Sequence, residues 1–577
     1  MRNNTNSVNK RLFFLASLIG ILFCAICGRL YYLQFMRRDY FVQLAEYQHI
    51  AKVKLLPERG LILDRNKQPL AINVQKESLF ADPREIDDPY LYAYKLARLI
   101  DVNEKELYKK LASKKSFVWI KRKVEEDEAN KVKELNLKGI YTRSEAKRVY
   151  PNNELLSHVI GFAGIDMDGL EGLELAFDNV LNGEQGWRIV AKDAKRREVA
   201  HFIPMEKPVK NGNTIELTID KVIQYIAEEA LDRAYHERKP IWTGIIIMRP
   251  STGEILAMAT RPTYDPNRYS EFPAEYRRNR VITDMYEPGS TFKTISCASA
   301  LDYGVVRFTD VFDCQNGRLQ YGGHTLRDSY PHQLLTFPEI IAVSSNIGAA
   351  KVAMNLGKEK LYEYLCNFEF GVAPDTMLLG ETEGILRDVK SWSKLSILSI
   401  PMGHEISVSP LQLLKGISAV ANGGILMKPY IIQRIVDDQG RTVQEFKPHK
   451  IRQVISHKTA KAMNEALKMV VQPGGTAIRA EMEEYTVAGK TGTAQKVIDG
   501  RYSQTKYVGS FVGYVPADDP QISMIVLFDE PKGHYWGGVI AAPVFKEVAQ
   551  KVLQYLEILP DRKTVSVDDA ATKDNGV

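Results

Sequence analysis

The chain has 577 residues, of which 45% are hydrophobic and 26% charged, so it is long enough for two or three globular domains. The formal net charge of +6 is small for this length, and no basic aromatic patch accompanies it, so no nucleic-acid binding is expected. The sequence predicts neither a metal site nor a bound cofactor. Its ten histidines are scattered, it has only five cysteines, and it has no His-Glu-x-x-His motif.

The first predicted element is an N-terminal membrane anchor. Residues 12–28 carry no charge, and with the apolar residues up to 33 the segment is about long enough to span a bilayer. No small-x-small cleavage site follows, which favours a retained anchor over a removed signal peptide. Basic residues lie on both sides of residues 12–33, so the positive-inside rule alone does not fix the orientation. A short tail, 1–11, without acidic residues favours the N-terminus inside and the remaining chain outside.

Residues 34–235 form a mixed, charged region without an evident catalytic cluster. The Lys- and Glu-rich stretch 104–150, including 121–128, predicts solvated helical faces. Arg59-Gly-Leu-Ile-Leu-Asp-Arg-Asn66 shows strand alternation between turn residues. The glycine-punctuated stretch 158–174 contains acidic residues but lacks EF-hand spacing, so we expect turns and packing there, not a calcium site.

Residues 236–556 predict a second domain of the α+β class. A hairpin is expected from 244–248 and 255–259, followed by a mainly helical middle up to about 420. Strands at 507–514 and 522–528 and an amphipathic helix at 543–556 complete it. Strands from both ends around a helical middle predict one antiparallel sheet flanked by helices. The polar tail, 557–577, is expected to be disordered.

Three short motifs stand in order along this domain. They are Ser290-Thr-Phe-Lys293, Ser344-Ser-Asn346 and Lys490-Thr-Gly-Thr493. Ser-x-x-Lys also occurs by chance, at residues 7–10 and 391–394, so the residues around Ser290 must distinguish it from these copies. Pro288-Gly289 breaks the chain before Ser290, and the following run is suited to start a helix that puts Lys293 one turn away.

These residue types predict serine acyl transfer. A serine hydroxyl needs a base, and Lys293 can serve only if it is held partly neutral, through burial or a neighbouring cation such as Lys490. The position of Ser290 at a helix start favours developing negative charge. We expect the backbone N–H groups of Ser290 and Thr493 to bind the oxyanion.

The other motif residues predict substrate binding. Ser344 can pass a proton to a leaving amine, and Asn346 can pair with a substrate amide. Lys490, with the hydroxyls of Thr491 and Thr493, forms a plausible carboxylate receptor.

The third motif and the residues before it allow two further interpretations, one for Gly492 and one for a phosphate-binding loop. Gly492 would let a substrate backbone lie close to its strand. A phosphate-binding P-loop ending at Thr491 fails, because Glu484 stands where that loop requires glycine.

The three motifs together resemble those of the class B penicillin-binding proteins, which are membrane-anchored peptidoglycan D,D-transpeptidases. The resemblance extends from the anchor to about residue 556. It includes Arg59-Gly-x-Ile-x-Asp-Arg-Asn66 and Gly169-Leu-Glu-Gly-Leu-Glu174 in the family's non-catalytic pedestal. Tyr286-Glu-Pro-Gly-Ser290 and Gly474-Gly-Thr-Ala477 are similar to the cell-division member.

The resemblance implies a function and a location. Stem peptides ending in D-Ala-D-Ala would acylate Ser290, and the amine of a stem peptide on a neighbouring glycan strand would take the acyl group. β-lactams would acylate Ser290 and remain bound as a lasting adduct. It implies a single-pass protein of the bacterial cytoplasmic (inner) membrane with its catalytic domain outside. A membrane glycosyltransferase and other division-complex proteins are the implied partners.

Three alternatives stay open at this point. The chain could serve cell elongation instead of division, since the two members share the motifs. It could be a β-lactam-hydrolysing or sensing relative, although no deacylating glutamate can be placed from sequence. It could also act chiefly as a scaffold of the division complex.

Overall fold

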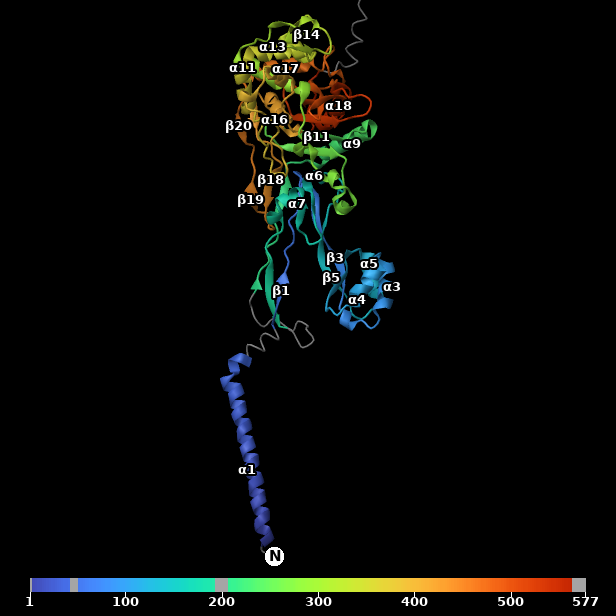
Figure 1. Ribbon diagram of the computed structural model, residues 1–577, viewed down its shortest axis with the longest axis vertical. Coiled ribbons are helices and arrows are strands. Elements are labelled where there is room, and N and C mark those ends of the chain that lie inside the picture. The colour runs from blue at the N-terminus through green and yellow to red at the C-terminus, as the bar shows by residue number, and fades with distance from the viewer. Residues whose placement is uncertain (1–2, 42–49, 192–205, 563–577) are drawn as a thin grey trace, which may run out of the picture. The chain divides into compact units, whose positions relative to one another are not determined.

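The computed structural model describes residues 3–41, 50–191 and 206–562. Contacts divide the chain into two compact units (Figure 1). The first comprises Met1–Pro57 and Gly183–Asn211, and the second comprises Glu58–Asn182 and Gly212–Val577.

The first unit begins with a long apolar helix. α1 (Asn3–Tyr31) continues into the π-helical segment η1 (Tyr32–Met36). Among the described residues, the side chains at positions 7–31 are exposed, and Phe13 is 77% exposed. Because about 20 apolar helical residues cross the hydrocarbon of a bilayer, the 30-residue helix Ser7–Met36, with its uncharged run at 12–28, fits a single-pass anchor, as predicted for 12–33.

The rest of the first unit is a small antiparallel sheet. It consists of β1 (Ile50–Leu55), β8 (Gly186–Ala191) and β9 (Glu206–Lys207), with β8 in the middle.

The second unit contains two larger sheets, of which the first lies in the predicted pedestal. This sheet has seven strands, of which five come from the pedestal region: β2 (Ile62–Leu63), β3 (Pro69–Ala81), β4 (Val118–Val124), β5 (Ile140–Val149) and β10 (Thr214–Leu217). Three helices enclose a separate small core with β3 and β4; they are α3 (Pro89–Ile100), α4 (Glu104–Leu111) and α5 (Glu126–Glu134).

The prediction of helical faces throughout 104–150 is wrong for two segments. β4 and β5 are strands within that range, and only α4 and α5 are helical. In β4 the alternating Val118 and Ile120 are buried in the small core, while Trp119 and Lys121 are only half-buried. This two-residue period outweighs the charge of the stretch, because burying one apolar face stabilises a strand.

The second sheet is antiparallel and has the order β12-β11-β23-β22-β21. Its strands are β11 (Trp242–Met248), β12 (Ile255–Arg261), β21 (Ala488–Ile498), β22 (Arg501–Val515) and β23 (Ile522–Asp529). The predicted hairpin and later strands are confirmed, as is the α+β class. The chain thus joins strands from both ends of the predicted domain into one sheet.

Helices cover both faces of this sheet (Figure 1). α18 (Gly537–Tyr555) packs on one face, where Phe545 meets Phe511 of β22 at 4.8 Å between ring centroids. α16 (Pro410–Ala421) packs on the other, where Ser418 hydrogen-bonds Ser523 of β23 at 2.7 Å. Successive strand residues point to opposite faces, and the register puts Phe511 and Ser523 on different ones. α18 begins six residues before the predicted start at 543, with Pro543 inside the helix.

The pedestal and the second sheet share elements. α9 (Lys221–Arg238) spans the boundary placed at 235/236 and packs on β12 and α18. β18 (Ile432–Val436), which pairs with β19 (Thr442–Glu445), joins β10 of the pedestal sheet. Residues 557–562 are ordered, with Asp561 accepting from the backbone N–H of Thr486. The rest of the predicted tail, 563–577, lies outside the described residues.

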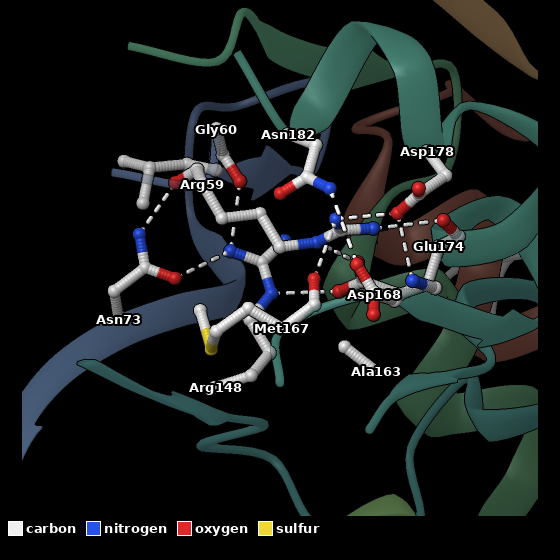
Figure 2. A network of polar contacts seen from close by, with 12 residues as sticks. Arg59, Gly60, Asn73, Arg148, Ala163, Met167, Asp168, Glu174, Asp178 and Asn182 are labelled. Carbon is white, nitrogen blue, oxygen red and sulfur yellow. Dashed lines mark hydrogen bonds and ion pairs between the residues drawn. The ribbon is translucent and has the colours of Figure 1, made fainter. Parts of the chain in front are cut away.

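A buried ion network connects the two pedestal motifs (Figure 2). Arg59 donates to Glu174 and to Asp178, each at 2.6 Å, and Arg148 donates to the other oxygen of Glu174 at 2.6 Å. The side chains of Arg59, Arg148 and Glu174 are at most 2% exposed. Since a buried charge without a partner is costly, the residue types at 59, 148 and 174 depend on one another.

The remaining elements of the second unit include η2 (Pro83–Glu85), α6 (Ser157–Ile160), β6 (Phe162–Ala163), β7 (Gly169–Glu171), α7 (Gly172–Ala176), α8 (Asp178–Leu181), η3 (Pro266–Glu271), η4 (Ala274–Arg277), α10 (Arg280–Thr283), β13 (Val311–Asp313), η6 (Gln315–Gly317), β14 (Arg318–Tyr321), β15 (His324–Arg327), β16 (Leu334–Thr336), α12 (Phe337–Ala342), α14 (Lys358–Asn367), η7 (Val389–Ser391), α15 (Ser396–Ser399), η8 (Ile400–Met402), β17 (Ile425–Met427), β20 (Lys450–Gln453), α17 (His457–Met469) and η9 (Ile478–Ala480).

Candidate active site

Ser290 lies in a tight helical turn that begins at the glycine of the Pro288-Gly289 break. η5 (Gly289–Phe292) runs directly into α11 (Lys293–Tyr303). Gly289 has φ of 57°, and its N–H donates to the carbonyl of Gly403 at 3.2 Å. A Cβ on Gly403 would lie 2.3 Å from the carbonyl oxygen of Gly289, so glycine is required for this contact. The half-buried Ser290 is therefore presented by a fixed turn.

Lys293 joins the first two motifs. Its fully buried side chain donates from Nζ to the backbone oxygen of Ser344 at 2.6 Å, to Asn346 Oδ1 at 2.7 Å and to Ser344 Oγ at 3.2 Å. Ser344 has φ of 61°, an uncommon conformation for a residue other than glycine. Burial lowers the pKa of Lys293 to about 8, although the nearby charge of Asp328 raises it. A buried lysine with three acceptors can both hold and release a proton at this point.

Asp328 organises the second motif and was not singled out in the sequence. Its carboxylate accepts from the backbone N–H groups of Asn346 and Ile347, the latter at 3.0 Å, and from Ser345 Oγ at 2.6 Å. These groups form the N-terminus of α13 (Asn346–Leu356), where a negative charge is stabilised. Asp328 lies in an irregular segment after β15, and no spacing rule links it to Asn346.

Lys490 is the second fully buried lysine of the site. Its Nζ lies 3.3 Å from the carbonyl oxygen of Thr491 and 3.4 Å from Thr491 Oγ1, both weak contacts. Burial, followed by repulsion from Lys293, holds the pKa of Lys490 well below its usual range. Burial, not the charge of Lys490, is thus the main cause of the lowered pKa of Lys293.

The two threonines of the third motif are held by neighbouring segments. Thr491 Oγ1 lies 2.8 Å from Thr476 Oγ1, within the Gly-Gly-Thr-Ala motif. Thr493 Oγ1 accepts from the N–H of Gly537, the first residue of α18, at 3.2 Å. Both hydroxyls therefore have defined positions beside the start of α18.

Gly492 allows β21 to pack against the turn that carries Ser290. A Cβ there would lie 2.5 Å from Ser510 Oγ, 2.9 Å from Thr291 Cγ2 and 3.0 Å from the carbonyl oxygen of Pro288. The missing side chain accounts for this close approach of protein to protein. Its expected role toward a substrate backbone stays a prediction.

The outer edge of β21 can receive an extended peptide. Among the described strands, β21 pairs with β22 alone and ends the sheet. An edge strand offers unpaired N–H and C=O groups to which another extended segment can be added. Within the described ranges, no group of three or more His, Cys, Asp or Glu side chains is placed to hold a metal ion.

Comparison with known families identifies this arrangement. Residues 243–550 match the penicillin binding protein transpeptidase domain, and residues 54–217 match the penicillin-binding protein dimerisation domain. The chain belongs to the class B penicillin-binding proteins, and its enzymatic activity is that of a peptidoglycan D,D-transpeptidase. Peptidoglycan is accordingly its substrate and β-lactams are its ligands.

Relatives match over nearly the whole chain. Stage V sporulation protein D of Bacillus subtilis is 37% identical over 98% of this chain and 88% of its own length. Peptidoglycan D,D-transpeptidase FtsI of Escherichia coli K12 is 32% identical over 97% of this chain and 94% of its own. The crystal structure of penicillin-binding protein 3 from Mycobacterium tuberculosis with aztreonam superposes with a TM-score of 0.70 at 26% identity, covering 88% of this chain and 98% of that one.

Proposed function

We propose that Ser290 is the acylated nucleophile, Lys293 its base and Ser344 the proton relay of this transpeptidase. The observation that carries the proposal is the position of Lys293 Nζ, one helical turn after Ser290 and in hydrogen-bonding distance of Ser344 and Asn346. With a pKa of about 8, about one tenth of Lys293 is neutral at pH 7, which suffices for a general base.

The first half-reaction releases D-alanine. Neutral Lys293 takes the proton of Ser290 Oγ, which attacks the carbonyl of the penultimate D-alanine and forms a C–O bond. The N–H groups of Ser290 and Thr493 stabilise the oxyanion. The C–N bond then breaks, and the proton on Lys293 passes through Ser344 Oγ to the leaving amine.

The second half-reaction reverses these roles. The amine of a neighbouring stem peptide attacks the acyl carbonyl, forming the C–N bond of the cross-link while the C–O bond to Ser290 breaks. The amine's proton returns to Ser290 by way of Lys293. The other motif residues act in the first half-reaction, before D-alanine leaves: Lys490, Thr491 and Thr493 bind the donor's terminal carboxylate, whose charge favours the protonated form of Lys490. Asn346 pairs with a donor amide along the edge of β21.

The adduct with penicillin tests this assignment. We expect mass spectrometry of the digested protein to find a long-lived penicilloyl group on Ser290 and none in Ser290→Ala. An adduct on another residue would overturn the assignment, and rapid turnover of the drug would favour a β-lactam hydrolase. Full rescue of growth by Ser290→Ala in a depleted strain would instead support a scaffold role.

We further propose that this chain acts in septal wall synthesis, with a membrane glycosyltransferase and other division-complex proteins as partners. The motifs Tyr286-Glu-Pro-Gly-Ser290 and Gly474-Gly-Thr-Ala477 support this choice. Depletion distinguishes the roles, because loss of septal synthesis leaves filaments whereas loss of elongation rounds the cells.

The orientation we propose has the N-terminus inside and the catalytic domain outside the membrane. Cys366 is exposed, Cys297 and Cys314 are buried, and the other two cysteines lie in α1. A membrane-impermeant maleimide should therefore label intact spheroplasts, and Cys366→Ser should abolish the labelling. Labelling only after lysis would contradict this orientation and place the catalytic domain inside.

A further inference from the structure

The β21–β22 hairpin extends beyond the sheet to which it belongs. β22 pairs with β23 only from Val508 to Val515, whereas its pairing with β21 continues to Arg501. The register of this outer part shifts between Gln495 and Val497. A two-stranded hairpin is marginally stable by itself, so contacts outside the sheet must fix the direction of this extension.

One such contact reaches the segment that carries Ser290. Tyr502, in the outer part of β22, donates from its hydroxyl to Glu287 Oε1 at 3.3 Å. Glu287 lies three residues before Ser290, and its side chain is 15% exposed. The hairpin is also anchored at the end of β23, where Lys496 pairs with Asp529 at 2.9 Å and with Glu530 at 2.8 Å, and Lys506 pairs with Glu530 at 3.3 Å.

The carboxylate of Glu287 also binds a third segment. Its Oε1 accepts from the backbone N–H of Glu405 at 2.9 Å, and its Oε2 lies 2.9 Å from His404 Nδ1. The ring of His404 packs edge-on against Tyr502 at 5.3 Å between centroids. The neighbouring Gly403 is the residue whose carbonyl oxygen accepts from Gly289. One carboxylate therefore connects the hairpin, the 403–405 loop and the turn of Ser290.

We propose that Glu287, His404 and Tyr502 form a clasp that holds the outer hairpin against the nucleophile turn. These three are positioning residues, because they act through the backbone that they hold. The clasp fixes β21, and with it Thr493, relative to Ser290. The pre-set geometry between nucleophile and oxyanion donors is what the acylation step requires.

This inference rests on the proposed role of Ser290 and adds to it. Opening the clasp should slow acylation without abolishing it, because Lys293 keeps its hydrogen bonds to Ser344 and Asn346. A missing adduct in the wild-type protein would reject the nucleophile itself, whereas an unchanged rate in a clasp variant would reject only the clasp.

Tyr502→Phe removes the contact to Glu287 and keeps the ring. We expect the first-order acylation step with penicillin to slow about three- to tenfold, with little change in the non-covalent dissociation constant. Hydrogen exchange of residues 496–506 should increase while that of α11 stays unchanged. A role limited to overall stability would lower the melting temperature and leave the acylation step of the folded protein unaltered.

Tyr507→Phe is the matched control. Tyr507 lies in the same hairpin, but its hydroxyl donates to the carbonyl of Gln504 at 3.0 Å and not to Glu287. The Tyr507→Phe variant should be acylated by penicillin at the wild-type rate. Glu287→Gln should slow acylation like Tyr502→Phe, and the double variant should be no slower than the slower single one. Wild-type exchange and rate in Tyr502→Phe, or fully additive effects in the double variant, would overturn the clasp.

Discussion

Lys293 Nζ lies 2.7 Å from Asn346 Oδ1, so a hydrogen bond joins the first residue of α11 to the second motif, 53 residues further along the chain. A lysine in this position must shed a proton to act as a base, yet its acceptors stabilise the protonated form. Burial tips the balance, because it lowers the pKa of Lys293 to about 8. The site is therefore poised to respond to pH.

Acylation should accelerate as pH rises through about 8. Below the pKa of Lys293 the base is protonated, and above it the base is free, so the second-order rate constant with penicillin should show an acid limb centred near 8. Lys293→Arg, which cannot lose its proton, should lower the rate by about 10²- to 10⁴-fold. A limb centred below 6.5 would point to a histidine or carboxylate as the base.

Asp328→Asn should move this acid limb to lower pH. The charge of Asp328 raises the pKa of Lys293, so removing it favours the neutral lysine. The variant should also lose about 1–3 kcal/mol of unfolding free energy, because an amide cannot accept all three hydrogen bonds at the start of α13. Rate–pH profiles and denaturant titrations measure the two effects.

The control for this experiment is Asp313→Asn. Asp313 accepts from the backbone N–H of Gln315 and from the side chain of Gln333, and it makes no contact with α13 through its carboxylate. The acid limb of the Asp313→Asn variant should coincide with that of the wild-type protein. An acid limb that moves equally in both variants would show that the charge of Asp328 has no specific effect on the pKa of Lys293.

Much of this site could be predicted from local sequence. A Pro-Gly break before a helical run places Lys293 beside Ser290, and apolar strands of regular length identify β11 and β23. Asp328 is not marked by any motif, and Glu287 is marked only as part of Tyr286-Glu-Pro-Gly-Ser290. The contacts of both acids could not be predicted, because their partners lie in other segments and only the tertiary fold brings them together. The sequence predicts helix at β4 because its two lysines and one arginine mask the alternation of Val118 and Ile120.

Gly492→Ala should slow acylation while leaving the fold intact. The new Cβ would lie 2.5 Å from Ser510 Oγ and 2.9 Å from Thr291 Cγ2, so β21 must move away from the nucleophile turn. A displacement of this kind can lower the rate by about 10²-fold. Adding Ser510→Ala removes one of the contacts and should restore part of the rate, whereas Ser510→Ala alone should be near wild type. Equal rates in Gly492→Ala and its Ser510→Ala double variant would show that Ser510 is not the obstacle.

Glu174→Gln should destabilise the protein strongly, although Glu174 lies in the pedestal motif, outside the three motifs that contain Ser290, Ser344 and Lys490. The substitution leaves Arg59 and Arg148 buried without their shared carboxylate, which typically costs about 3–5 kcal/mol. Glu125→Gln is the control, because Glu125 is 62% exposed where it pairs with Lys76, and such pairs contribute about 0–1 kcal/mol. Thermal and denaturant unfolding of the soluble part of the chain measure the difference. A loss in Glu174→Gln no larger than that in Glu125→Gln would mean that water or rearrangement satisfies the two guanidinium groups, and that the network fixes conformation without adding stability.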